Sequence, residues 1–190
     1  MMKKSHKIGA LIIFLLPCIG LVVMNQCYRT KIANLQKASF ILIDKGDMSL
    51  KVFNPSGEIM MEFPIGVGIN YGNKVEKGDY RTPEGVFKVQ QIQDASNWKH
   101  DFGDGNGEIA GAYGPCFIRL FTPPHTGIGI HGTHDPASIG TRCTEGCIRL
   151  HNENVDVLKD FVYPGLPVII LPSEIDSKEN LKNISLLRQP

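Results

Sequence analysis

The chain has 190 residues, a length that suits one domain of ordinary size rather than two. Hydrophobic residues make up 42% and charged residues 21%, a globular composition that excludes a disordered chain and a membrane protein with many spans. Outside residues 1–27, which hold three lysines and no acid, 17 basic residues face 19 acidic ones, so the charge gives no broad reason to hold nucleic acid.

Residues 1–27 form a separate segment that does not belong to the fold. Three lysines precede an apolar run without charge, residues 8–24, in the manner of a signal segment. The run is barely long enough to cross a bilayer, so an uncleaved anchor and a cleaved signal peptide both stay open. We favour an anchor in the inner membrane, with residues 28–37 as a linker and the remaining domain on the periplasmic side of the cell envelope.

The next part of the chain predicts a β-meander. Short runs with alternating apolar side chains favour strands over residues 40–44, 48–53 and 58–65, because successive side chains of a strand face opposite sides. Turn-forming clusters separate these runs, Lys45-Gly46-Asp47 first and Asn54-Pro55-Ser56-Gly57 second.

Further strands are predicted over residues 86–92, 116–121 and 128–131. Residues 94–114 hold five glycines and few apolar side chains, which predicts a long surface loop. Such a loop inside a compact domain is more often functional than idle.

One helix is predicted near the end of the domain. Asn152 is expected to cap it, and apolar side chains between residues 155 and 162 recur at spacings of three and four along one face. A last strand is expected over 168–171, and residues 173–190 show no decisive pattern. The expected fold is mainly β with one substantial helix.

The densest group of reactive side chains lies in residues 127–134 and 144–151. A thiol becomes a nucleophile at neutral pH only if a neighbour takes its proton, and His131 can do this for Cys147. The pair alone is weak evidence, because a buried cysteine is usually a small hydrophobic residue. Gly146 strengthens it, since glycine lets the backbone turn tightly and aim its amides at a substrate carbonyl.

These segments resemble the catalytic domain of the bacterial L,D-transpeptidases of the YkuD type. The resemblance covers residues 38–172 and leaves residues 173–190 as a tail. The matching motifs are, in order, Lys77-Gly-Asp-Tyr-Arg-Thr-Pro-Glu-Gly-Val-Phe87, Tyr113-Gly114, Phe117-Ile-Arg-Leu120, Ile128-Gly-Ile-His-Gly-Thr133, Ile139-Gly140, Gly146-Cys-Ile-Arg-Leu150, Asn152 to Leu158 and Gly165 to Ile170.

The resemblance implies a β-sandwich-like fold and an enzyme without a cofactor. Its cysteine takes the acyl group of a peptidoglycan stem tetrapeptide and passes it to an amine of another stem or of a protein. Cys147 would be the nucleophile and His131 its base, with the carbonyl of Gly132 as the orienting group. Backbone amides of Glu145, Gly146 and Cys147 would form the oxyanion hole.

Three side chains are expected to contact the substrate, namely Arg149, Tyr113 and Thr133. The guanidinium fork of Arg149 suits a substrate carboxylate. Tyr113 and Trp98 either line the groove or merely pack, and the sequence does not choose between the two.

The motif departs from the family pattern at one position. The family usually has Ser-His-Gly-Cys, and this chain has Thr144-Glu145-Gly146-Cys147. A carboxylate there would raise the pKa of the thiol, or it would stabilise a protonated His131, and the sequence leaves both open. Three functions therefore remain: a transpeptidase, an L,D-carboxypeptidase or endopeptidase that uses water, and a lapsed domain that only binds peptidoglycan.

The remaining histidines and cysteines are weaker candidates. His134 and His151 flank the site, whereas His100 and His125 are predicted to be surface residues. A disulfide between Cys116 and Cys143 is an open alternative outside the cytoplasm. No metal site is expected, because the Cys143 to Cys147 spacing is not that of a zinc knuckle.

Overall fold

The computed structural model describes residues 24, 26, 37–103, 105 and 107–187. Contacts divide the chain into two units, Met1–Lys37 and Ala38–Pro190. Apart from residue 24, the predicted anchor over residues 8–24 lies outside the described residues, as does most of its linker. Among the helices that the structure describes, none is long and apolar enough for a membrane crossing.

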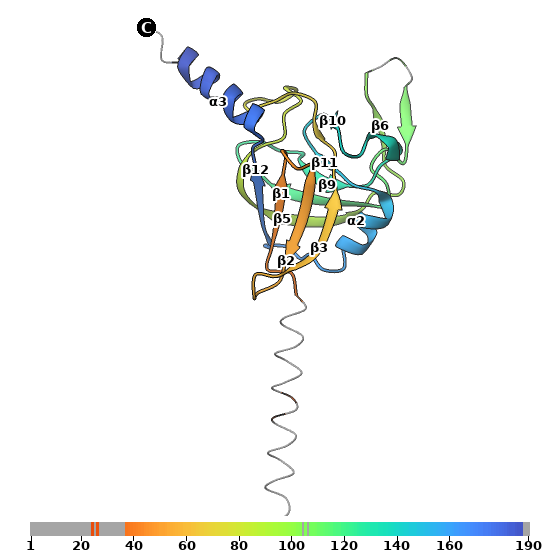
Figure 1. Cartoon of the computed structure of the whole chain (residues 1–190). Helices are drawn as coiled ribbons and strands as arrows, with labels where there is room; N and C mark the ends of the chain where they lie inside the picture. Colours follow the sequence, from red (N-terminus) through yellow and green to blue (C-terminus); the bar gives the residue numbers. More distant parts are fainter. Residues whose placement is uncertain (1–23, 25, 27–36, 104, 106, 188–190) are drawn as a thin grey trace, which may run out of the picture. The chain divides into compact units, whose positions relative to one another are not determined.

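The unit Ala38–Pro190 consists mainly of short strands (Figure 1). It also contains a short 3-10 helix, Pro136–Ser138, and two α-helices, α2 (Asn152–Leu158) and α3 (Glu174–Leu187). The strands are β1 (Phe40–Asp44), β2 (Ser49–Phe53), β3 (Ile59–Pro64), β4 (Val67–Gly68), β5 (Gly85–Asp94), β6 (Lys99–Asp101), β7 (Glu108–Ala110), β8 (Cys116–Phe121), β9 (Gly129–His131), β10 (Arg142–Thr144), β11 (Ile148–Arg149) and β12 (Pro167–Leu171).

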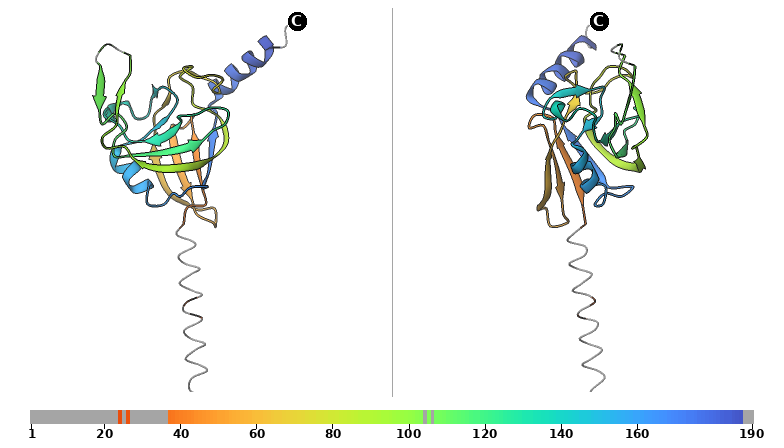
Figure 2. Two further views of the ribbon diagram at one scale, coloured as in Figure 1. Left: turned by 180° about the vertical axis from the view of Figure 1, so that it is seen from behind. Right: turned by 90° about the vertical axis from the view of Figure 1, so that its right-hand side faces the viewer.

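Eight strands form one sheet in the order β11-β9-β8-β5-β12-β1-β2-β3. The sheet curls so that its two ends face each other as layers (Figure 2). The predicted meander is confirmed as β1, β2 and β3, which pair in antiparallel fashion. Strand β12 lies between β1, to which it is parallel, and β5, to which it is antiparallel.

The curled sheet encloses an apolar core. Along β1 and β12 every second residue is buried, because one face of each strand points inward. The innermost side chains, each at most 2% exposed, include Ile41, Ile43, Leu50, Val52, Ile118, Leu120, Ile130, Ile148, Leu150 and Val168.

Helix α2 differs from its prediction at both ends. His151, not Asn152, is the N-cap residue, and the helix ends at Leu158. The side chain of Asn152 is used elsewhere: its Oδ1 accepts the backbone N–H of Thr133 at 2.7 Å. Asn152 thus joins the start of α2 to the segment that follows β9.

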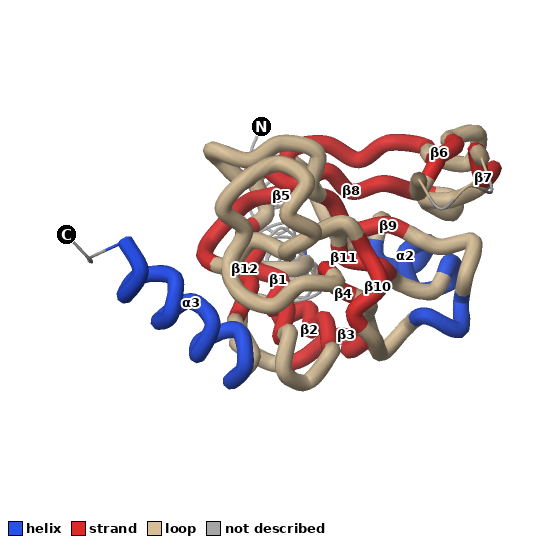
Figure 3. Tube along the Cα trace, turned by 90° about the horizontal axis from the view of Figure 1, so that it is seen from above, coloured by secondary structure: helices blue, strands red, loops and turns tan. Residues whose placement is uncertain are grey.

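Two segments hold structure that the sequence did not predict. The region 94–114 is not a simple loop, since β6 and β7 pair within it as a hairpin. The tail forms α3, which lies on the opposite side of the domain from the hairpin (Figure 3). Asp176 is the one buried side chain among the described side chains of α3, so the helix shows no apolar stripe.

Candidate active site

Strand alternation brings the predicted catalytic pair to one side of the sheet. Strands β9 and β11 run parallel, with Ile130 opposite Ile148 and His131 opposite Arg149. The two isoleucines face the core, so His131, Arg149 and, one residue before β11, Cys147 point to the other face. Cys147 and His131 line the same small cavity, which has a volume of about 40 Å³.

His131 is held in the form that can accept a proton. Its Nδ1 lies 2.6 Å from the carbonyl oxygen of Gly132. A carbonyl only accepts, so Nδ1 carries the hydrogen and Nε2 keeps a free lone pair. Burial lowers the pKa of His131 to about 3, with the Gly132 contact opposing the shift. At neutral pH the imidazole is therefore uncharged.

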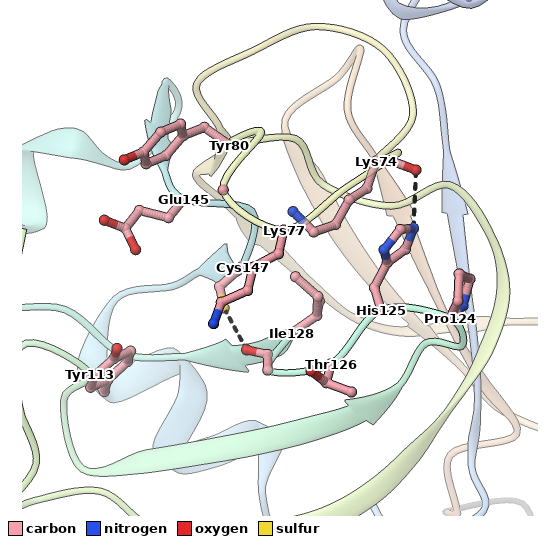
Figure 4. A pocket seen from close by; sticks show the side chains of 12 residues that line it. Lys74, Lys77, Tyr80, Tyr113, Pro124, His125, Thr126, Ile128, Glu145 and Cys147 are labelled. Atoms are coloured by element: carbon pink, nitrogen blue, oxygen red, sulfur yellow. Dashed lines mark hydrogen bonds between the residues drawn. The ribbon is translucent and has the colours of Figure 1, made fainter.

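Cys147 is a protonated thiol in the free protein. Its side chain is half-buried, and Sγ donates to the carbonyl oxygen of Gly127 at 3.5 Å (Figure 4). Burial raises the pKa of Cys147 to about 11, a hydrogen bond with Gly129 opposes this, and the Glu145 carboxylate raises the pKa further.

A raised thiol pKa predicts slow alkylation near neutral pH. The iodoacetamide labelling rate of Cys147 is expected to rise about tenfold per pH unit and still to be rising between pH 8 and 10, because only the thiolate reacts. Mass spectrometry of the labelled peptide measures the rate, with Cys147→Ala as the background. A rate that levels off a little above about pH 9 would show an ordinary thiol.

The turn before the cysteine is closed by the hydroxyl of Thr144. This buried Oγ1 donates to the carbonyl oxygen of Cys147 at 2.6 Å and accepts the N–H of Gly146 at 3.1 Å. A side chain at Gly146 would strike the Arg81 carbonyl oxygen, and its φ of 128° lies where glycine is favoured. The Gly146 amide is engaged, which leaves the amides of Glu145 and Cys147 as candidate oxyanion donors.

Thr144→Val is expected to slow acylation of Cys147 by about 10- to 100-fold, because both hydrogen bonds of the turn are lost. Thr144→Ser keeps the hydroxyl and serves as the matched control, with a rate close to that of the unaltered protein. The rate is measured as the mass gain with a carbapenem. Equal rates for the valine and serine variants would show that the hydroxyl does not set the turn.

Arg149 lies beside the pair with unused hydrogen-bonding capacity. The residue is 4% exposed, lines the small cavity, and donates from Nη1 to Ser138 Oγ at 2.9 Å. Its buried Nε has no hydrogen-bond partner within the described part of the chain. Buried donors are seldom left unpaired, so this guanidinium is suited to an acceptor group of a ligand.

The other two predicted substrate contacts differ in position. Tyr113 lines the small cavity, and its ring meets that of His131 edge-on at 5.0 Å. Thr133 is only 2% exposed, and its Oγ1 accepts the N–H of Asp135 at 2.8 Å. Thr133 is not among the residues that line either cavity around Cys147.

A larger groove, of about 350 Å³, opens on the other side of Cys147 (Figure 4). Lys74 and Lys77 contribute to its wall, and Glu145 lies near the cysteine. Lys74 is paired with Asp79 at 2.6 Å, whereas Lys77 is exposed. The groove thus offers an exposed cation at one part of its wall and a carboxylate at another.

Two histidines predicted to be surface residues contribute to these cavities. His125 lines the groove, and its Nε2 lies 3.1 Å from the carbonyl oxygen of Lys74. His100, on strand β6, lines the small cavity and contacts both Tyr113 and Glu145. Sequence reasoning missed His100 because its partners lie far away in the chain.

Cys116, Cys143 and Cys147 are free cysteines, so the alternative of a Cys116–Cys143 disulfide is wrong for this structure. Among the described residues, no group of three or more His, Cys, Asp or Glu side chains is arranged to hold a metal ion.

Comparison with known sequences identifies relatives of this protein. The family model described as YkuD, L,D-transpeptidase catalytic domain, matches residues 38–170. The YkuD protein of Bacillus subtilis (strain 168), whose name assigns it to the L,D-transpeptidases, is 52% identical over 115 residues, 60% of this chain and 56% of that protein. ErfK/SrfK of Escherichia coli K12 is 27% identical over 71% of this chain and 44% of its own length. This chain spans about half the length of these relatives.

Solved structures show the same fold. The helical cell shape determining protein Pgp2 from Campylobacter jejuni superposes with a TM-score of 0.53 and 26% identity, over 72% of this chain and 48% of that one. An L,D-transpeptidase from Mycobacterium smegmatis matches with a TM-score of 0.51 and 21% identity, over 70% and 59% of the two chains. The expectation of a mainly β fold of this type is confirmed.

Proposed function

Because the chain belongs to the L,D-transpeptidase catalytic domain family, we propose that it moves the acyl group of a peptidoglycan stem tetrapeptide to an amine through Cys147. One observation carries the proposal: a protonated thiol and an uncharged imidazole line one cavity. No cofactor is needed for this chemistry.

In the first half-reaction the thiol of Cys147 attacks the carbonyl between an L-centre and the terminal D-residue. Its proton passes to Nε2 of His131, whose Nδ1 stays bonded to Gly132. The amides of Glu145 and Cys147 receive the negative oxygen. When the intermediate collapses, the amine of the D-residue leaves with the proton from His131, and a thioester remains.

In the second half-reaction an amine attacks the thioester. His131 takes the proton that the amine loses and returns it to the departing sulfur, so the thiol is restored. Water in place of the amine would give an L,D-carboxypeptidase or endopeptidase. Arg149 is proposed to bind a carboxylate or carbonyl of the donor, because its buried Nε is unpaired.

The substrate places the protein in the cell envelope as part of this proposal. Its relative Pgp2 is described as a cell shape determining protein, which agrees with action on the wall. Residues 8–24 are proposed to hold the domain at the inner membrane, facing the periplasm. The amine acceptor is a second stem peptide or a protein.

The test uses the full chain in detergent with disaccharide tetrapeptides, and mass spectrometry of the products. Cross-linked dimers support the proposal, and Cys147→Ala is the control that should yield none. Tripeptides without dimers would identify a hydrolase. Unchanged substrate together with measurable binding would identify a lapsed domain.

A further inference from the structure

The β6–β7 hairpin contributes a second imidazole to the site. We infer that His100 is a positioning residue for the proposed transfer: with Tyr113 and Glu145 it fixes the hairpin against the cavity of Cys147 and His131, and so limits the access of water to the thioester. The inference rests on the proposed function. It adds a residue that affects whether the thioester reacts with an amine, which gives transfer, or with water, which gives hydrolysis.

Three side chains from separate segments form a chain of contacts. The hydroxyl of Tyr113 lies 3.1 Å from Nδ1 of His100. On the other side of the ring, Nε2 of His100 lies 3.2 Å from Oε2 of Glu145. The side chains of His100 and Glu145 are 27% and 41% exposed, so the contact lies at the mouth of the small cavity.

The hydrogen bonds between these three side chains run in one direction, from Tyr113 through His100 to Glu145. An ionised carboxylate only accepts, so Nε2 of His100 donates its hydrogen to Glu145. In the neutral imidazole Nδ1 then accepts the hydrogen of the Tyr113 hydroxyl. Both ring nitrogens of His100 thus have a partner, and the tyrosine ring that His131 packs against is held in place.

The contact of His100 with Tyr113 and Glu145 helps to hold the β6–β7 hairpin in position. Strands β6 and β7 pair with each other alone and form a sheet separate from the eight-stranded one. A two-stranded hairpin is marginally stable by itself. Its side chains that reach the cavity are those of His100 and Phe102, whose rings contact each other at 4.5 Å.

Glu145 acquires a role in this arrangement. It lies directly before Gly146 and Cys147 in the sequence. Its carboxylate gives the Nε2 hydrogen of His100 an anionic acceptor, and hydrogen bonds to charged groups are the stronger kind. The contact therefore joins the β6–β7 hairpin to the turn that carries Cys147.

Water competes with the amine for the thioester at Cys147. With the hairpin released, the small cavity under His100 and Phe102 would open to solvent, and hydrolysis would gain over transfer. The ratio of tripeptide to dimer therefore reports the position of the hairpin, and a simple loss of folded protein does not change this ratio.

The experiment compares variants of the full chain with the disaccharide tetrapeptide. His100→Phe keeps a ring but loses both polar contacts, and the tripeptide-to-dimer ratio is expected to rise about fivefold. Glu145→Gln replaces the anionic acceptor of the His100 Nε2 hydrogen by a neutral one and should raise the ratio by less. The double variant should add little beyond His100→Phe, because both changes act on the same contact. The matched control is Lys99→Met, which alters an exposed pair with Glu108 on the same hairpin and should leave the ratio unchanged.

His100→Gln retains a donor and an acceptor, so its tripeptide-to-dimer ratio is expected to lie between those of the unaltered protein and of His100→Phe. A His100→Phe ratio equal to that of Lys99→Met, in protein that still takes up a carbapenem at Cys147, overturns the inference. If His100→Phe does not fold, the same comparison is made with Glu145→Gln. Failure of the unaltered protein to be acylated would instead overturn the proposed function.

Discussion

Replacement of Cys147 by alanine is expected to abolish both dimer formation and the carbapenem adduct, with a loss of at least about 10⁴-fold in rate. The change removes the sulfur atom that we propose as the acceptor of the acyl group and leaves His131 and Arg149 in place. The fold should be little affected, because the hydrogen bonds of Sγ, to the carbonyl oxygen of Gly127 at 3.5 Å and with the backbone of Gly129, are the weak ones that sulfur makes. Intact mass and thermal unfolding measure the two effects.

Cys143→Ala is the matched control. Cys143 is a free, partly exposed thiol on β10 that does not line the cavities around Cys147. Its replacement should leave the rate of adduct formation within a few-fold of the original. An adduct that persists in Cys147→Ala and disappears in Cys143→Ala would move the nucleophile to Cys143.

The second large effect concerns a buried cluster of charges whose residues do not line the cavities around Cys147. Lys45 is fully buried, with Nζ 2.6 Å from Glu84 Oε1 and 3.2 Å from Asp176 Oδ1. The other carboxylate oxygen of Asp176 lies 2.7 Å from Nη2 of Arg142. Asp176→Asn removes the anion that two buried cations share, so the free energy of unfolding is expected to fall by about 3 kcal/mol.

In the Asp176→Asn variant, the free energy of unfolding should depend less on pH in the acid range. Burial opposes ionisation of Asp176, but hydrogen bonds from Ser173 and Gly72 and the charge of Lys45 outweigh it, and the pKa falls from 3.8 to about 2. This stabilisation is fully present above pH 3.8 and is lost as the pH falls through about 2. Urea unfolding at pH 7 and at low pH measures it.

Glu174→Gln provides the control within the first turn of α3. Its carboxylate is 83% exposed and pairs with Lys178, so the free energy of unfolding should change by less than about 0.5 kcal/mol. If Asp176→Asn is no more harmful than Glu174→Gln, the buried charges do not hold α3 to the domain.

Much of the sheet and the centre of the site could be predicted from local pattern. Alternation between buried and outward residues marks β1 and β2, and the predicted strand over 116–121 coincides with β8. The resemblance to the family pointed to His131 and the Gly132 carbonyl, and the two are in contact, with His131 Nδ1 2.6 Å from that oxygen.

Contacts between distant segments could not be predicted. His100 looked like a surface residue because nothing near it in sequence shows that Glu145 and Tyr113 lie beside it. Helix α3 was missed because it docks through Asp176 and Asn180, and polar side chains give no periodic apolar signal. The sequence also does not reveal where the Thr144 side chain points. Its hydroxyl accepts the N–H of Gly146, so that amide is already hydrogen-bonded.

The position of β12 between β5 and β1 determines when the eight-stranded sheet can be completed during folding. Its neighbours, β1 and β5, both precede it in the chain, β5 by more than 70 residues. The two parts of the sheet cannot join before β12 has been synthesised, since β12 is the strand between them. A chain cut short before residue 167 would leave β1 and β5 as open edges, ready to pair with other chains and aggregate.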